Sequence, residues 1–160
     1  MPFSAVVVQD ESLYDAFYGE YTEYKAFYHS HSYTGNPMAC RLALEVIDIL
    51  EHEVLPALPE RIEALSRILE TMDRLPHVCE TRQCGFVGAV ELVETREPFK
   101  RYDPACRIGW QVYREALKRG ALMRPLGEVI YFMTPLTIPI DVLEELGIIA
   151  YESIQTVTEQ

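Results

Sequence analysis

The chain has 160 residues, enough for one domain, or one and a fraction, with a buried core. Its 49% hydrophobic and 24% charged residues resemble an average globular protein, which argues against a disordered, collagen-like or disulfide-knot chain. It has 25 acidic and 14 basic residues, a formal net charge of −11 and no Lys/Arg cluster, so we expect no nucleic-acid or anionic membrane partner.

The N-terminus reads MPFSAVVVQDES and has neither a basic segment nor a long apolar stretch. We therefore expect no signal peptide, no membrane span and a cytoplasmic protein. In that compartment the four cysteines, at positions 40, 79, 84 and 106, are expected to be reduced. The Cys79-x4-Cys84 spacing is not that of a zinc or redox motif, so we interpret these residues as buried thiols and expect no metal.

The chain opens with a short apolar run at residues 3–8, which predicts a buried strand. Residues 10–19 follow with Leu13, Tyr14 and Phe17 at helical spacing, which predicts a short helix.

Residues 20–34 carry five aromatic side chains and two histidines without a clear period. Such an irregular segment packs either in the core of this chain or against a partner, and the sequence leaves both open.

Two long helices are predicted next. Asn36 suits the N-cap of the first, and Pro37 suits its first position because the missing N–H would have no helical partner there. Apolar spacing predicts the second helix over 59–75. Because prolines punctuate 52–59, we expect a bend or domain boundary in that region.

The pattern then changes to strands. Residues 85–93 predict a strand whose glycines admit a neighbouring backbone. Asp103 and Pro104 repeat the cap-then-proline signature and predict a helix that runs to Arg119 and stops at Gly120.

The last third predicts strands over 121–124 and 129–133, then a helix over 140–157. The expected buried stripe of that helix is Val142, Leu146, Ile149 and Ile154. Helices mixed with short strands on short connections favour an α/β or α+β sandwich with a small sheet.

One candidate site is the segment 29–37, HSHSYTGNP, which places hydroxyl groups and a glycine directly before a helix N-terminus. Free N–H groups and the helix dipole favour an anion there, and phosphate is the obvious ligand. The alternative is that Ser32, Thr34 and Asn36 only cap the helix. His29 and His31 could share a metal on an extended face, but no third ligand is apparent.

A second candidate is Arg124, which ends an apolar run and precedes Pro-x-Gly. A guanidinium held on a strand suits bidentate carboxylate binding. The alternative is a surface arginine paired with Glu128 or another acid. Tyr131 either offers a phenol beside it or simply packs.

Catalytic amines are scarce: Lys25, Lys100 and Lys118 are the three lysines. None has the apolar, strand-end context that would lower its pKa enough for Schiff-base chemistry. The sequence contains no Gly-rich phosphate loop and no G-x-S-x-G motif.

Residues 27–40, FYHSHSYTGNPMAC, resemble the H-G-x-[ST]-[FY]-x-G-N-P-x-A-C segment of class III pyridoxal-phosphate aminotransferases. The upstream run ESLYDAFYGEY and the downstream run LMRPLGEVIYFMTPLTI also match that family, in the same order. The resemblance covers essentially the whole chain and is greatest to the branch that acts in biotin synthesis. It implies the C-terminal part of a fold-type I enzyme, with a small mixed or antiparallel sheet covered by helices.

By that resemblance, residues 1–52 are the tail of a large cofactor domain and residues 53–160 the small C-terminal domain. The Schiff-base lysine would lie upstream of residue 3, so no catalytic residue is assigned in this chain. Ser32 matches the residue that binds the cofactor phosphate across a homodimer interface, and His31 would add a backbone contact. Ser30 stands where the family has glycine beside the substrate.

Arg124 and Tyr131 match the residues that bind the substrate carboxylate. The implied reaction of the intact enzyme transfers an amino group from S-adenosylmethionine to 8-amino-7-oxononanoate with pyridoxal 5'-phosphate. This chain alone would be inactive and would need the missing large-domain half and a partner subunit. The alternatives are a non-catalytic assembly module, split or degenerate, and a class III enzyme with another substrate.

Overall fold

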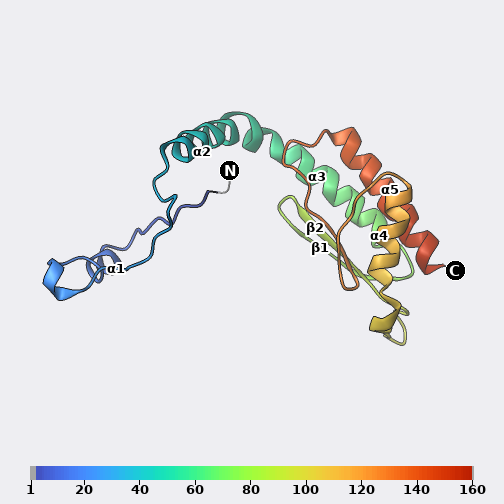
Figure 1. Ribbon diagram of the computed structural model, residues 1–160. Coiled ribbons are helices and arrows are strands. Elements are labelled where there is room, and N and C mark those ends of the chain that lie inside the picture. The colour runs from blue at the N-terminus through green and yellow to red at the C-terminus, as the bar shows by residue number, and fades with distance from the viewer. Residues whose placement is uncertain (1–2, 160) are drawn as a thin grey trace. The chain divides into compact units, whose positions relative to one another are not determined.

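The computed structural model describes residues 3–159, and they divide between Glu51 and His52 into two compact units (Figure 1). Unit 1 contains, in order, helix α1 (Glu11–Asp15), a 3-10 turn (Tyr21–Glu23) and helix α2 (Pro37–Ile49). The predicted cap of α2 is confirmed, since Asn36 Oδ1 accepts a hydrogen bond from the Ala39 N–H at 3.0 Å and Pro37 is the first helical residue.

The predicted strand over 3–8 is wrong: these residues form no regular element and Val6 is 92% exposed. A strand needs a neighbouring backbone, and none of the described residues pairs with this segment. The predicted helix over 10–19 is shorter, five residues behind an Asp10 cap. It buries no side chain, and a helix without packing is marginal at such length.

Of the bend or domain boundary expected at 52–59, the bend is wrong because the chain stays helical there, whereas the two units divide at the start of this region, between Glu51 and His52. A π-helical turn, Leu50–Val54, is followed by helix α3 (Leu55–Met72). Pro56 is the second residue of α3 and Pro59 lies inside it, shortly after the change from π-helical to α-helical backbone.

Unit 2 holds an antiparallel four-stranded sheet in the order β1-β2-β4-β3. Its strands are β1 (Val78–Cys84), β2 (Val87–Leu92), β3 (Pro125–Leu126) and β4 (Val129–Phe132). The strand predicted over 85–93 is confirmed as β2, but residues 78–84 form a further strand that sequence analysis missed. Gly85, at φ +55°, makes the turn between β1 and β2. The strand predicted over 121–124 is displaced to Pro125–Leu126.

Helices α4 (Ile108–Lys118) and α5 (Ile140–Thr158) complete unit 2. Asp103 caps only a 3-10 turn, Pro104–Cys106, and Arg107 at φ +48° separates that turn from α4. Gly120, at φ +93°, ends α4 as predicted.

The predicted buried stripe of α5 is confirmed at Ile154, while Leu146 and Ile149 are only partly buried against the core and Val142 is exposed. The buried face is centred instead on Leu143, Gly147 and Ala150. Gly147 meets Ile68 of α3, and a glycine contact carries no apolar signal in the sequence.

The core of unit 2 lies between the sheet and its helices, as Figure 1 shows for α3, α4 and α5. Alternate residues of β2, Gly88, Val90 and Leu92, face this core and are buried. The opposite face of the sheet, which we call the open face, carries more exposed side chains, including Arg82 and Glu91. None of the described helices is long and apolar enough to cross a membrane.

Candidate functional site

The candidate site residues of unit 1 lie in two consecutive turns before α2. The His31 N–H donates to Thr34 Oγ1 at 3.0 Å, and the Thr34 N–H donates back to the His31 carbonyl at 2.9 Å. Gly35, at φ +71°, then turns the chain into the Asn36 cap. The side-chain oxygens of Thr34 and Asn36 are therefore engaged in hydrogen bonds with backbone N–H groups of this segment.

Ser32 differs from its neighbours. Among the described residues its hydroxyl has no hydrogen-bond partner, and the residue is exposed. Ser30 is exposed as well, and the His31 ring lies edge-on to His29 with centroids 5.4 Å apart. The segment thus presents the Ser32 hydroxyl, while the His31 N–H is already used inside the turn.

The candidate residues of unit 2 lie on one hairpin. β3 pairs antiparallel with β4, and Pro125 is opposite Ile130. Continued by one residue, that register sets Arg124 opposite Tyr131, so both belong to the open face of the sheet. Gly127, at φ +62°, makes the tight turn between the strands.

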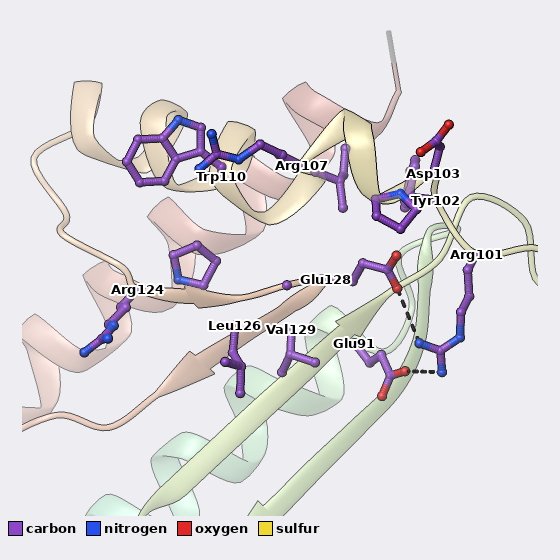
Figure 2. A pocket seen from close by; sticks show the side chains of 14 residues that line it. Glu91, Arg101, Tyr102, Asp103, Arg107, Trp110, Arg124, Leu126, Glu128 and Val129 are labelled. Carbon is purple, nitrogen blue, oxygen red and sulfur yellow. Dashed lines mark hydrogen bonds and ion pairs between the residues drawn. The ribbon is translucent and has the colours of Figure 1, made fainter.

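Arg124 has no ion-pair partner within residues 3–159. The alternative expected from sequence, a pair with Glu128, is wrong because Glu128 faces another arginine. Its Oε2 lies 3.5 Å from Arg101 Nη1, and Arg101 Nη2 lies 3.2 Å from Glu91 Oε1 (Figure 2). The guanidinium of Arg124 is therefore available to a ligand.

A cavity of about 770 Å³ extends along this edge of the sheet. Figure 2 shows Arg124 and Arg101 at opposite ends of it, with Trp110 and Arg107 above the strands. The Arg107 guanidinium carbon lies 5.2 Å from the centre of the Trp110 ring, a cation–π contact. Tyr131 is not part of the cavity lining.

Of the three carboxylates that line the cavity, Glu91 and Glu128 are paired with arginines, while Asp103 accepts a hydrogen bond from the Ala105 N–H. Arg82 Nη1 donates to Glu91 at 2.7 Å, and this bond, more than the charge of Arg101, holds the pKa of Glu91 below its usual range against the opposing effect of burial. Burial raises the pKa of Tyr102, which keeps that phenol neutral. Because Glu91 and Glu128 are engaged with arginines, the cavity retains the positive charge of Arg124 for an anion such as a carboxylate.

No lysine of the chain suits Schiff-base chemistry. Lys25 pairs with Glu23 at 3.2 Å, Lys100 with Glu94 at 2.5 Å and Lys118 with Glu115 at 2.6 Å. Each of these side chains is partly or largely exposed beside a carboxylate, and none lies in the apolar pocket in which a Schiff-base lysine is activated.

Sequence analysis missed the arginine–carboxylate network of Glu91, Arg101 and Glu128. Its only sequence signal was a charge inside the apolar strand 85–93, at Glu91. It also missed Trp110, whose position in the cavity follows from the 3-10 turn that sets the start of α4.

The family model of class III aminotransferases matches residues 1–151. An adenosylmethionine-8-amino-7-oxononanoate aminotransferase from Geobacter sulfurreducens is 41% identical over 159 residues, which are 99% of this chain and 35% of that protein. The protein of the same description from Nitratidesulfovibrio vulgaris is 41% identical over 160 residues, 29% of its length. The chain thus spans about a third of the length of the curated relatives that it matches.

Solved structures agree with these relatives. The adenosylmethionine-8-amino-7-oxononanoate aminotransferase of Methanocaldococcus jannaschii superposes with a TM-score of 0.86 at 34% identity, over 92% of this chain and 34% of that one. An aminotransferase from Vibrio fluvialis, at 22% identity and a TM-score of 0.77 over 87% of this chain and 31% of that one, shares the fold. The antiparallel sheet and its helices are accordingly those of the C-terminal portion of a fold-type I transaminase. The chain belongs to the class III aminotransferase family.

Proposed function

We propose that this chain is the C-terminal part of an aminotransferase that moves an amino group from S-adenosylmethionine to 8-amino-7-oxononanoate, a step of biotin synthesis. The carbon that loses nitrogen in the donor becomes a ketone, and the ketone of the acceptor becomes an amine, so no outside oxidant or reductant is needed. The names of the relatives at 41% identity support this reading. The observation that carries it is an unpaired Arg124 opposite Tyr131 on the open face.

Arg124 supplies acceptor recognition. Its guanidinium binds the substrate carboxylate through two parallel N–H···O bonds, which fixes the orientation of the chain that ends in that carboxylate. The Tyr131 hydroxyl donates to the same carboxylate from the paired strand. Because Glu128 and Glu91 are held by Arg101, they do not compete with the substrate for Arg124.

Class III aminotransferases depend on pyridoxal 5'-phosphate, which when bound supplies the electron sink for amino-group transfer. The free, exposed hydroxyl of Ser32 fits a donor to the phosphate of that group. His31 serves by closing the turn that presents Ser32, and Ser30 lies beside the substrate. The N-terminal end of α2 adds a favourable dipole for the anion.

In our proposal the Schiff-base lysine lies upstream of this chain, in the large cofactor domain. Residues 1–52 are the tail of that domain, and residues 53–160 are the small domain. Ser32 reaches the site of a second copy, which makes the working enzyme a homodimer. The three surface lysines support the expectation that the 160-residue chain alone has no transaminase activity.

The test compares the 160-residue chain with the full-length protein, and with its Arg124→Ala and Arg124→Lys variants, in 8-amino-7-oxononanoate turnover. We expect no turnover by the chain alone. In the full-length protein we expect kcat/KM to fall about a hundredfold for Arg124→Ala. The fall should be smaller for Arg124→Lys, which keeps the positive charge but loses the two parallel N–H donors of the guanidinium. Unchanged turnover in both variants would show that Arg124 does not bind the acceptor, and no turnover of this acceptor by the unmodified full-length protein would point to another substrate.

A non-catalytic assembly module is the second candidate, favoured by the paired lysines. It predicts that a full-length protein, reconstituted with pyridoxal phosphate, turns over no amino donor. The phosphate contact has its own readout: Ser32→Ala should weaken binding of pyridoxal phosphate, measured by its absorbance on titration.

A further inference from the structure

We propose that Gly109 is a positioning residue for Arg124, an inference that rests on the proposed function. Gly109 is the second residue of α4 and is buried. A Cβ atom at this position would overlap the backbone carbonyl oxygen of Gly127 and lie 2.9 Å from the Cβ atom of Pro125. The β3–β4 hairpin therefore rests directly on the backbone of the first turn of α4.

This contact controls Arg124 because the atoms involved belong to a stiff part of the hairpin. The Gly127 oxygen is main chain and the Pro125 Cβ is part of a ring, so neither can swing aside as a flexible side chain would. Pro125 also restricts the backbone of the residue before it, which is Arg124. A side chain at position 109 would therefore displace the hairpin and change the direction in which the Arg124 side chain points.

The other side of the hairpin is held independently. The Glu128 carbonyl accepts a hydrogen bond from the Leu92 N–H at 3.0 Å, and its carboxylate lies 3.5 Å from Arg101. The hairpin is therefore fixed between α4 on one side and β2 with Arg101 on the other. With that second side fixed, a side chain at Gly109 would tilt the hairpin rather than move it freely away.

Gly147 provides a matched control. It is also a buried glycine within a helix, and a Cβ atom there would lie 2.9 Å from Ile68 Cγ1. The obstructing atoms belong to a side chain at the contact between α3 and α5, and Gly147 does not line the Arg124 cavity. Gly147→Ala therefore disturbs packing without touching the hairpin.

The experiment measures kcat/KM of the full-length protein for 8-amino-7-oxononanoate and for its primary amide, which lacks the negative charge. The ratio of the two values reports carboxylate recognition, whereas a general loss of folded enzyme lowers both values equally. We expect Gly109→Ala to reduce this ratio about ten- to a hundredfold, the scale for a misplaced recognition group. Gly147→Ala should leave the ratio unchanged, whatever it does to the unfolding temperature.

A folded Gly109→Ala variant with the ratio of the unmodified protein overturns the inference. If that variant does not fold, Glu128→Gln takes its place, because it removes the ion pair to Arg101 and should lower the ratio about two- to threefold. An unchanged ratio there also overturns the inference. Arg124→Ala separates the two proposals: if it leaves the ratio unchanged, carboxylate recognition by Arg124 is itself wrong. If only Arg124→Ala lowers the ratio, the role of Gly109 alone fails.

Discussion

Unit 1 and unit 2 differ in how much of their apolar side-chain surface they bury. In unit 2 nineteen buried residues form one core shared by the sheet and the helices. In the described part of unit 1 the single buried apolar residue is Ala39, while aromatic residues such as Tyr21, Phe27 and Tyr33 are 69–81% exposed. Unit 2 therefore buries its own apolar side chains, whereas the described part of unit 1 leaves most of its aromatic side chains exposed, as a surface that contacts a partner would.

The largest expected effect tests the core of unit 2. Phe132 is 2% exposed, and Phe132→Ala should lower the free energy of unfolding by about 3–5 kcal/mol, the cost of lost burial plus a cavity. Phe27→Ala in unit 1 is the matched control and should change it by less than about 0.5 kcal/mol. Urea unfolding of the 160-residue chain measures both. Equal losses in the two variants would contradict the contrast between the units.

A smaller effect is expected at the start of α2. Asn36→Ala removes the cap bond to the Ala39 N–H and should cost the helix about 1 kcal/mol, while Asn36→Ser keeps a capping oxygen. Hydrogen exchange of the α2 amides is the measurement. Since α2 lies in unit 1, the unfolding midpoint of unit 2 should not move; a shift there would show that the units are energetically coupled.

A pH effect of similar or smaller size is expected in unit 2. The pKa of Glu91 is lowered, chiefly by the hydrogen bond from Arg82, so the folded state binds a proton at Glu91 less readily than the unfolded state. The stabilisation is therefore present above about pH 4.5 and lost as the pH falls below it. Its size should be at most about 1 kcal/mol because Arg82 is partly exposed.

Glu91→Gln should accordingly destabilise unit 2 at pH 7 and match the unmodified chain near pH 3. Glu45→Gln in unit 1 removes an exposed pair with Arg41 and serves as the control, with no expected change. Urea unfolding at the two pH values decides the matter, and a Glu91→Gln variant that is equally destabilised at both would contradict the sign.

The smallest effect concerns thiol reactivity. The interpretation of the four cysteines as buried thiols is wrong, since Cys40 and Cys79 are half-buried and Cys84 and Cys106 are exposed. Partial burial, and then the charge of Glu91, raise the pKa of Cys79. In single-cysteine variants at pH 8, Cys79 should react more slowly with iodoacetamide than Cys106, and denaturation should remove the difference. Equal native rates would show that β1 opens readily.

Local signals in the sequence predicted what local chemistry decides. Asn36 begins α2 and Gly120 ends α4, because caps and left-handed turns depend on neighbouring residues. Arg124 and Tyr131 were expected together, and each adjoins a paired residue of the β3–β4 hairpin, Pro125 and Ile130, while their shared role stays a prediction. The strand predicted from the apolar run at 3–8 was wrong because an apolar pattern does not reveal whether a partner strand is present.

What sequence analysis missed depends on long-range contacts. Residues 78–84 read as polar because their charged side chains lie on the open face, and only pairing with β2 makes them a strand. Glu91 and Arg101 are ten residues apart, and Glu128 is further still, so no periodicity links them. The close approach at Gly109 is likewise set by two segments that meet only in the fold.

The strand order has a consequence for self-association by sheet extension. It leaves β1 and β3 at the two edges, where unpaired backbone groups can recruit a strand from another molecule. β3 is only two residues long and one of them is Pro125, which has no N–H to donate. β1 has an irregular register near Val78 and carries Glu80 and Arg82. Both edges therefore disfavour extension of the sheet by a strand from another molecule, so the fold of unit 2 itself opposes fibril-like stacking.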